Sequence, residues 1–149
     1  MTMRTWKMKI KIKKLVPEAE IPSLGSPNSA GIDLCAIAET EIPPHSTVKI
    51  GTGLSFELPE GTFGAIFARS GLATKEGLRP ANCVGVCDSD YRGEYIVALH
   101  NDSDKTRLVM PGNRIAQLIV MRYPIVTIEE VDELSDTERG DGGFGHTGR

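Results

Sequence analysis

The sequence is poor in aromatic residues, in cysteine and in long apolar runs. Of its 149 residues, 5% are aromatic and 3 are cysteines. Its longest apolar runs, such as residues 63–68, are far shorter than the roughly 20 residues of a transmembrane helix. Three thiols do not make the disulfide framework of a small secreted domain, and Cys83 and Cys87 lack the nearby histidine or second cysteine pair of a zinc site. We therefore expect a cytoplasmic protein with reduced, buried cysteines, no targeting segment and no membrane partner.

Glycine and proline, in contrast, are frequent and spread along the whole chain. The 16 glycines and 9 prolines interrupt any helix longer than two or three turns. This spacing excludes a helical bundle and a long coiled coil. The chain is 40% hydrophobic and 25% charged with a net charge of -3, which is too balanced for a disordered protein, and its length fits one domain.

Short alternating segments between turn residues indicate an all-β protein. We expect strands near residues 7–16, 30–36, 47–50, 54–58, 63–68, 83–87, 94–101, 106–109, 113–122 and 126–131. Turn residues such as Pro43-Pro44 and Pro111-Gly112 separate them. Regular spacing of this kind predicts a jelly-roll-like β-barrel or sandwich. At most one short helix is expected, near residues 71–76, with Ser70 as its N-cap and Gly77 at its end.

The two ends of the chain differ in composition from the middle. The first fourteen residues hold six basic side chains and no acidic one. Residues 8–13 alternate strictly, however, which places the lysines on the solvated face of a strand and makes nucleic acid an unfavoured partner. Residues 139–149 include five glycines and have too little apolar surface to order themselves. We therefore predict one β domain over residues 1–138 and a flexible glycine-rich tail over residues 139–149.

Five segments place polar residues among apolar or glycine-rich neighbours, and these are the candidate sites. They are residues 30–36, 68–73, 85–94, 112–118 and 139–148. In the first, Asp33 is costly to bury without a partner. In the fourth, Arg114 and Gln117 are embedded in an apolar run, and the fifth carries a single aromatic residue, Phe144.

The second and third segments carry the most chemistry. Arg69, Ser70 and Gly71 open the predicted helix, where free N–H groups, a guanidinium and a hydroxyl favour a phosphate group. A capped helix with a surface arginine has the same pattern. Asp88 lies in a carboxylate-rich turn, either as a turn former or as a group that polarises water or positions a metal ion. Tyr91 beside it is suited to pack flat against a ring.

Taken in this order, the five segments resemble the five signature motifs of the trimeric deoxyuridine triphosphatase (dUTPase) family. They run from Ala30 to Gly148, and the lysine-rich strand lies outside them. The resemblance implies a jelly-roll homotrimer whose three sites are shared between subunits. It also implies hydrolysis of dUTP to dUMP and pyrophosphate with Mg²⁺ bound through the phosphates, a reaction that keeps uracil out of DNA and supplies dUMP for thymidylate synthesis.

The resemblance assigns roles to particular residues. Asp88 corresponds to the carboxylate that activates the attacking water, and Asp33 to an acid that helps to hold the water shell of the metal. The residues implied to bind substrate are Arg69, Ser70, Gly71, Asn82, Tyr91, Gln117, Arg139, Phe144, Gly145, His146 and Thr147. Among them, Asn82 and the hairpin that follows receive uracil, and Tyr91 packs under the deoxyribose.

The tail has a specific role in this interpretation, as a lid that closes over the bound nucleotide. His146 stands where many family members have serine. Cys87 stands where isoleucine or valine is commoner, and we expect it to be a small apolar filler. Arg114 is expected to form a structural ion pair rather than to bind substrate.

Two other functions remain open from the sequence. A dCTP deaminase, or a bifunctional deaminase–dUTPase, shares the fold, but its pattern generally lacks the glycine-rich tail and the Asp90-Tyr91 pair. A binding module on the same scaffold requires the loss of a catalytic position, whereas Asp88, Arg69 and Gln117 are all present. Both alternatives are therefore less favoured than the monofunctional enzyme.

Overall fold

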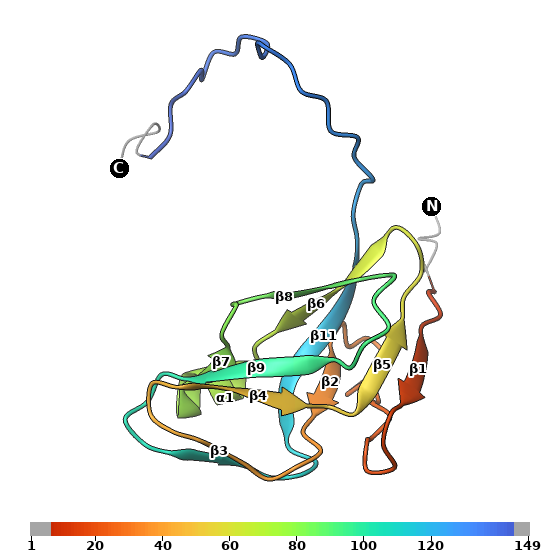
Figure 1. Cartoon of the computed structure of the whole chain (residues 1–149), viewed down its shortest axis with the longest axis vertical. Helices are drawn as coiled ribbons and strands as arrows, with labels where there is room; N and C mark the ends of the chain where they lie inside the picture. Colours follow the sequence, from red (N-terminus) through yellow and green to blue (C-terminus); the bar gives the residue numbers. More distant parts are fainter. Residues whose placement is uncertain (1–6, 145–149) are drawn as a thin grey trace.

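Two β-sheets form the body of the computed structural model, which describes residues 7–144 (Figure 1). The four-stranded sheet has the order β2 (Ile32–Cys35), β11 (Arg114–Arg122), β6 (Thr62–Phe67), β8 (Gly85–Asp88). The three-stranded sheet has the order β4 (Thr47–Gly51), β9 (Ile96–Asn101), β7 (Leu78–Pro80). Two smaller pairs join β1 (Lys11–Lys14) to β5 (Leu54–Glu57) and β10 (Arg107–Val109) to β3 (Thr40–Ile42), and every pairing is antiparallel.

One hydrophobic cluster fills the space between the sheets. Its members from the four-stranded sheet include Leu34, Ile66 and Leu118, and those from the three-stranded sheet include Ile50, Val97 and Leu99. Each is nearly inaccessible to water, and burial of one such side chain contributes roughly 1.5–3 kcal/mol. The alternation of apolar and polar residues that predicted the strands therefore also places the apolar side chains in the core. The jelly-roll prediction is confirmed.

Most predicted strands are present, but one is missing and two were not predicted. Residues 126–131 form no strand, and Val126 and Ile128 are 72% and 92% exposed. Their alternation is suited to a strand, yet within residues 7–144 no strand lies beside them to pair with. The two strands that were not predicted are β3 and β7, which have three residues each.

The single helix of the described residues, α1 (Ser70–Glu76), begins one residue earlier than predicted. The N-cap is Arg69, whose carbonyl accepts the Ala73 N–H at 3.0 Å, and no side chain caps the helix. Ser70 is therefore the first helical residue and not the cap. The predicted end at Gly77 is confirmed, since this glycine has φ 70°, a left-handed conformation that glycine adopts without strain. No helix in this part of the chain is long and apolar enough to cross a bilayer.

The lysine-rich strand lies as its alternation predicted. Ile12 packs against the core cluster, while Lys11 and Lys13 are exposed. Lys11 Nζ lies 2.5 Å from Glu57 Oε1 on β5. The expectation of buried cysteines is wrong in one case, because Cys83 is exposed and adopts φ 63°, while Cys35 and Cys87 are partly buried.

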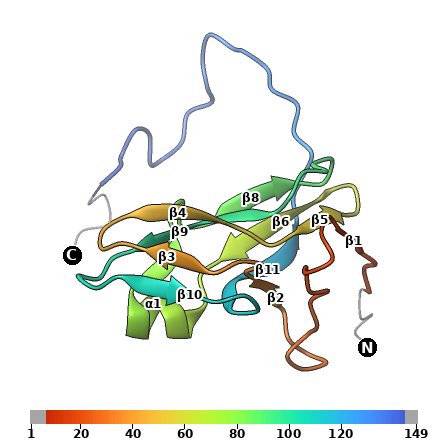
Figure 2. The same ribbon diagram turned by 60° about the horizontal axis from the view of Figure 1, so that its bottom comes forward.

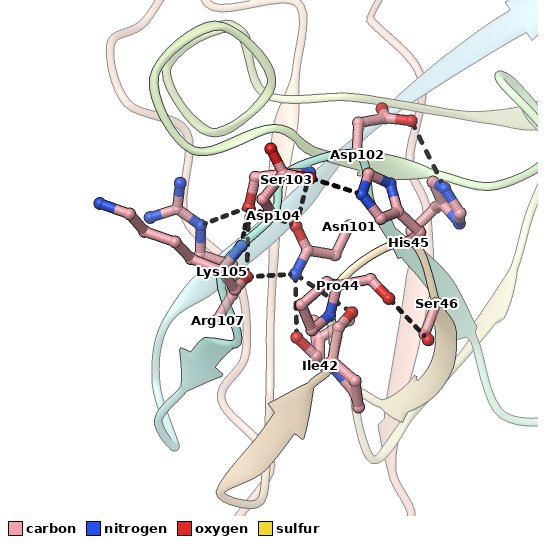
Figure 3. Close-up of polar contacts among 12 residues, drawn as sticks. Ile42, Pro44, His45, Ser46, Asn101, Asp102, Ser103, Asp104, Lys105 and Arg107 are labelled. Atoms are coloured by element: carbon pink, nitrogen blue, oxygen red, sulfur yellow. Dashed lines mark hydrogen bonds and ion pairs between the residues drawn. The ribbon is translucent and has the colours of Figure 1, made fainter.

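A buried amide joins the end of β3 to the loop between β9 and β10 (Figure 3). Asn101, the last residue of β9, is 0% exposed. Its Nδ2 donates to the carbonyls of Ile42, Pro43 and Lys105 at 2.9, 3.2 and 2.7 Å. Its Oδ1 accepts the N–H and the hydroxyl of Ser103 at 2.9 and 2.7 Å. The amide thus satisfies backbone groups that would otherwise be buried without partners.

We predict that Asn101→Ala lowers the free energy of unfolding by about 3 kcal/mol, because it leaves buried carbonyls unpaired. Urea denaturation at one fixed protein concentration measures this loss. Asp104→Ala is the matched control, since Asp104 accepts a bond from His45 at the exposed edge of the same cluster and should change stability by less than about 1 kcal/mol. A loss as small in Asn101→Ala as in the control would contradict the role given to the amide.

Candidate active site

A cavity of 300 Å³ lies between β8 and the segment that leads into β9. It is lined by three residues of the predicted site, Asn82, Asp88 and Tyr91. Glu94 and Tyr95, which were not predicted as site residues, line it as well. The structure therefore brings the predicted catalytic carboxylate together with the residues expected to hold uracil and deoxyribose.

The cavity exists because β8 and β9 belong to different sheets. β8 pairs with β6, whereas β9 pairs with β4 and β7. The predicted hairpin is therefore not formed, since its two arms bond to other strands and diverge around the cavity. The turn between them is held by hydrogen bonds from Tyr91 N to the Asp88 carbonyl at 3.2 Å and from Ser55 Oγ to the Arg92 carbonyl at 2.8 Å.

The side chain of Tyr91 folds back onto the turn in which Tyr91 lies, and this contact positions its ring. Its hydroxyl donates to the Glu94 carbonyl at 3.1 Å, and its ring lies so close over Gly93 that a Cβ there would overlap it. The Glu94 carboxylate is in turn fixed to the body, because Oε1 accepts the Gly53 N–H at 2.8 Å. The Tyr91 side chain is thus anchored at its hydroxyl, and the residue stays 45% exposed beside the cavity.

Cys87 precedes Asp88 on β8 and also lines the cavity. Burial raises the pKa of its thiol, and the neighbouring Asp88 raises that pKa as well, against a lowering contribution from Tyr95. A raised pKa keeps the thiol neutral and weakly nucleophilic. This environment agrees with the predicted role of Cys87 as a small apolar filler.

A second group of predicted residues surrounds Asp33. Its Oδ1 accepts from Arg69 Nε at 3.0 Å and its Oδ2 accepts from Arg114 Nη1 at 3.3 Å. Asp33 was expected to need a partner, and it has two, the guanidinium groups of Arg69 and Arg114. The ion pair predicted for Arg114 is therefore confirmed. Gln117 lies on the neighbouring strand, opposite Asp33 in the register, and donates Nε2 to the Ala68 carbonyl at 2.9 Å. We call Asp33, Arg69, Arg114 and Gln117 the arginine cluster.

Ser70 and Gly71 follow this cluster at the start of α1. Both are exposed, and a Cβ at Gly71 would meet nothing within 4 Å. No packing therefore requires glycine there, which leaves space for a ligand to approach the backbone closely. Arg69 and Arg114 also line a cavity of 440 Å³, in which Asp88 takes no part.

Strand β6 separates the two groups within one chain. Asp88 lies opposite Phe63 near the start of β6, and Gln117 lies opposite Phe67 at its end, on the other edge. Four residues of strand correspond to about 13 Å. The structure therefore brings Asn82, Asp88 and Tyr91 together, and Asp33, Arg69 and Gln117 together, but it does not join the two groups.

Residues 126–144 extend away from the body after β11 (Figures 1 and 2). The residues just before them still contact the body, because Tyr123 N donates to the Gly61 carbonyl at 3.2 Å and its ring packs edge-on against Phe63. Tyr123 and Ile125 also line a second cavity together with Asp88. Arg139 Nε donates to the Gly142 carbonyl at 2.7 Å within the tail, and the Phe144 side chain is fully exposed. The predicted residues Gly145, His146 and Thr147 lie outside the described residues.

The side chains available to bind a metal ion can be compared with those that Mg²⁺ prefers. Residues 7–144 contain no group of three or more His, Cys, Asp or Glu side chains that could enclose an ion. Mg²⁺ in proteins commonly keeps several waters and binds through one or two carboxylates and the phosphates of a substrate. Asp33 is bonded to two guanidiniums, yet each carboxylate oxygen retains a further lone pair. These residues would suit a Mg²⁺ ion carried by substrate phosphates, which Asp33 would hold through the water molecules of the ion.

Glu94 and Tyr95 are the cavity residues that sequence reasoning missed. Tyr95 occupies an inward position just before β9 and is 1% exposed, so its pattern is that of a core residue. Glu94 follows Gly93 in a turn, where a carboxylate is typical of a solvated surface. The only sequence signal for either residue was its closeness to Asp88 and Tyr91 along the chain.

Comparisons with known proteins agree with this arrangement. The family model described as dUTPase matches residues 17–148. A deoxyuridine 5'-triphosphate nucleotidohydrolase of Nautilia profundicola is 48% identical over 142 residues, covering 95% of this chain and 100% of the relative. A protein of the same name from Arabidopsis thaliana is 47% identical over 138 residues, covering 93% and 82%.

Solved structures show the same fold. A mutant dUTPase of Staphylococcus bacteriophage 80alpha, solved with dUpNHpp, superposes with a TM-score of 0.84 at 25% identity, and the match covers 95% of this chain and 99% of that one. Sequence and fold agree over nearly the whole chain, which confirms the resemblance carried by the five motifs. The chain belongs to the dUTPase family.

Proposed function

We propose that Asp88 is the general base with which this dUTPase hydrolyses dUTP to dUMP and pyrophosphate. The observation that carries this assignment is that Asp88 lines one cavity with Asn82 and Tyr91. Asp88 takes a proton from a water molecule as the water oxygen attacks the α-phosphorus. The bond from that phosphorus to the oxygen that bridges it to the β-phosphorus breaks, and pyrophosphate leaves with the electron pair. A positioned carboxylate of this kind contributes roughly 10²–10⁴-fold to the rate.

The cavity beside Asp88 takes the nucleoside in this proposal. Asn82 offers an amide that can both donate to and accept from the edge of uracil, and cytosine leaves such groups unmatched at a cost of about 1–3 kcal/mol each. Tyr91 offers the flat face of its ring to the deoxyribose, which leaves no space for a 2'-hydroxyl. Selection of base and sugar then depends on packing and hydrogen bonding.

The phosphates are bound by Arg69 and Gln117 of the arginine cluster, together with Ser70 and Gly71. A guanidinium and an amide suit the several oxygens of a triphosphate, while Asp33, itself paired with Arg114, keeps the Arg69 guanidinium in place. When Mg²⁺ is bound, it neutralises charge on the leaving phosphates. Residues 139–149 form a lid that closes over the nucleotide. The lid residues that contact it are Arg139, Phe144, Gly145, His146 and Thr147.

We also propose that the active enzyme is a homotrimer whose sites combine residues of different subunits. Two observations support this proposal. Asp88 and the arginine cluster lie on opposite edges of β6, with Asp88 opposite Phe63 and Gln117 opposite Phe67, so that a complete site takes each from a different subunit. In addition, the segment between β11 and the tail carries exposed apolar side chains, namely Ile125, Val126, Ile128 and Leu134, which a partner surface would cover. The cytoplasmic location stays a prediction from the sequence.

A substrate panel tests the reaction. With Mg²⁺ present, we expect pyrophosphate release from dUTP and at least about 100-fold slower release from dCTP, dTTP and UTP. Removal of Mg²⁺ with a chelator should lower the rate with dUTP. Release of ammonia from dCTP would indicate a deaminase instead, and no turnover of any nucleotide would indicate a binding module.

Asp88→Asn should lower kcat for dUTP by at least about 100-fold, because an amide cannot accept the proton of the attacking water. The KM should change little, since the side chain keeps its size. Asp90→Asn is the matched control, as Asp90 lies in the same turn but is absent from the cavity that Asp88 shares with Asn82 and Tyr91, and lines only a second cavity next to Asp88; it should leave kcat within about threefold. Steady-state kinetics that show equal effects of the two substitutions would contradict the role of Asp88.

Truncation before Arg139 should leave the body folded, because Arg139 bonds only within the tail and Phe144 is fully exposed. The loss of the lid should lower kcat/KM by about 100-fold. Thermal unfolding and the oligomeric state of the truncated chain are measured beside its activity. Unfolding on truncation, or unchanged turnover, would each contradict a lid.

A further inference from the structure

Tyr95 connects the hydrophobic core to the nucleoside cavity. Its side chain is 1% exposed, and one face of its ring packs on Phe56, with centroids 4.4 Å apart and planes at 38°. Tyr91 also packs against it, with centroids 6.1 Å apart and planes at 34°. Tyr95 therefore contacts both Phe56 of the core and Tyr91 beside the cavity, with its ring tilted against each.

The backbone holds Tyr95 firmly on the sandwich. Its N–H donates to the Leu54 carbonyl at 2.8 Å, and its carbonyl accepts the hydroxyl of buried Thr52 at 2.6 Å. Tyr91, in contrast, lies in a turn, is 45% exposed and has its hydroxyl bonded only to the Glu94 carbonyl. The ring of Tyr95 is thus a fixed surface, and Tyr91 is the side chain that needs support.

The Tyr95 hydroxyl does not provide this support. It is buried over β6, where a Cβ at Gly64 would come within 3.3 Å of it. No hydrogen bond of ordinary geometry joins it to a described residue, and its one polar neighbour, the Cys87 thiol, is a weak hydrogen-bonding group. Burial, followed by the effect of Cys87, raises the pKa of Tyr95, so the phenol stays neutral. The contribution of Tyr95 to the cavity therefore comes from its ring.

We propose that Tyr95 is a positioning residue that holds the Tyr91 ring against the deoxyribose, so that rejection of a 2'-hydroxyl depends on the Tyr95 ring. The proposal rests on the proposed role of Tyr91 at the sugar. A ring excludes a single oxygen atom only if it cannot move aside. With the Tyr95 ring removed, the Tyr91 ring has space to move toward the core, and a ribose then fits.

The test compares kcat/KM for dUTP and UTP in Tyr95→Leu and Tyr95→Phe. Tyr95→Leu should lower the preference for dUTP over UTP by about 10-fold. We expect kcat/KM for UTP to rise and KM for dUTP to rise, while kcat for dUTP changes by less than about threefold. Tyr95→Phe keeps the ring and loses only an unpartnered hydroxyl, so it should keep both the preference and the stability. A folded Tyr95→Leu enzyme with unchanged preference would overturn the proposal, as would a Tyr95→Phe enzyme that loses it.

Two comparisons separate this inference from general destabilisation and from an error in the proposed function. Leu99→Ala removes a core side chain of β9 that does not line the cavity, and it should lower stability with the preference intact. Tyr91→Leu should relax the preference directly. If it does not, the proposed role of Tyr91 is wrong; if it does while Tyr95→Leu does not, only the present inference is wrong.

A measurement on the unsubstituted protein covers the case in which Tyr95→Leu does not fold. With dUMP bound, proton NMR of the tyrosine-labelled enzyme should show nuclear Overhauser contacts between the rings of Tyr91 and Tyr95. Absence of these contacts in the nucleotide complex would show that the two rings separate on binding, which would overturn the proposal.

Discussion

The pairing of β6 on both of its edges is the constraint on which both halves of the candidate site depend. One edge fixes Asp88 opposite Phe63, and the other fixes Gln117 opposite Phe67. Ala65 and Ile66 between them are buried. Because these consecutive residues point to opposite faces, both faces of β6 are covered. A slip by one residue would exchange the side chains that pack on the two faces, and core packing therefore sets the register that places the two functional groups.

The two halves are held by different forces. The cavity beside Asp88 is built by packing, since Tyr91 is supported by a neighbouring ring and Gly93 has no Cβ to displace it. The arginine cluster is built by charge, with one carboxylate holding two guanidiniums that would otherwise repel each other. Packing suits the selection of a base and a sugar, whose shapes are fixed, while guanidiniums suit phosphate oxygens, which many geometries satisfy.

Sequence patterns predicted those features that depend on a residue and its near neighbours. The long strands β9 and β11 showed their period, Gly77 ended the helix, and the lone carboxylate Asp33 required a partner, which proved to be two arginines. Features that depend on distant segments were missed or wrong. Alternation over residues 126–131 could not tell whether an edge was available for pairing, and the hairpin that the resemblance implied between Asn82 and Tyr91 is absent because β8 bonds to β6.

Tyr95 shows why a functional role escapes a sequence pattern. The alternation of buried and exposed residues is consistent with its burial in the core. Nothing in that alternation distinguishes Tyr95 from Val97 or Leu99, which are equally buried. The difference arises from what lies on the outer side of its ring, namely Tyr91 and the cavity. A core side chain in direct contact with a substrate-facing one transmits the rigidity of the sandwich to the site. Stability and selectivity then share one residue, because the packing that lowers the free energy of the fold also fixes the wall of the pocket.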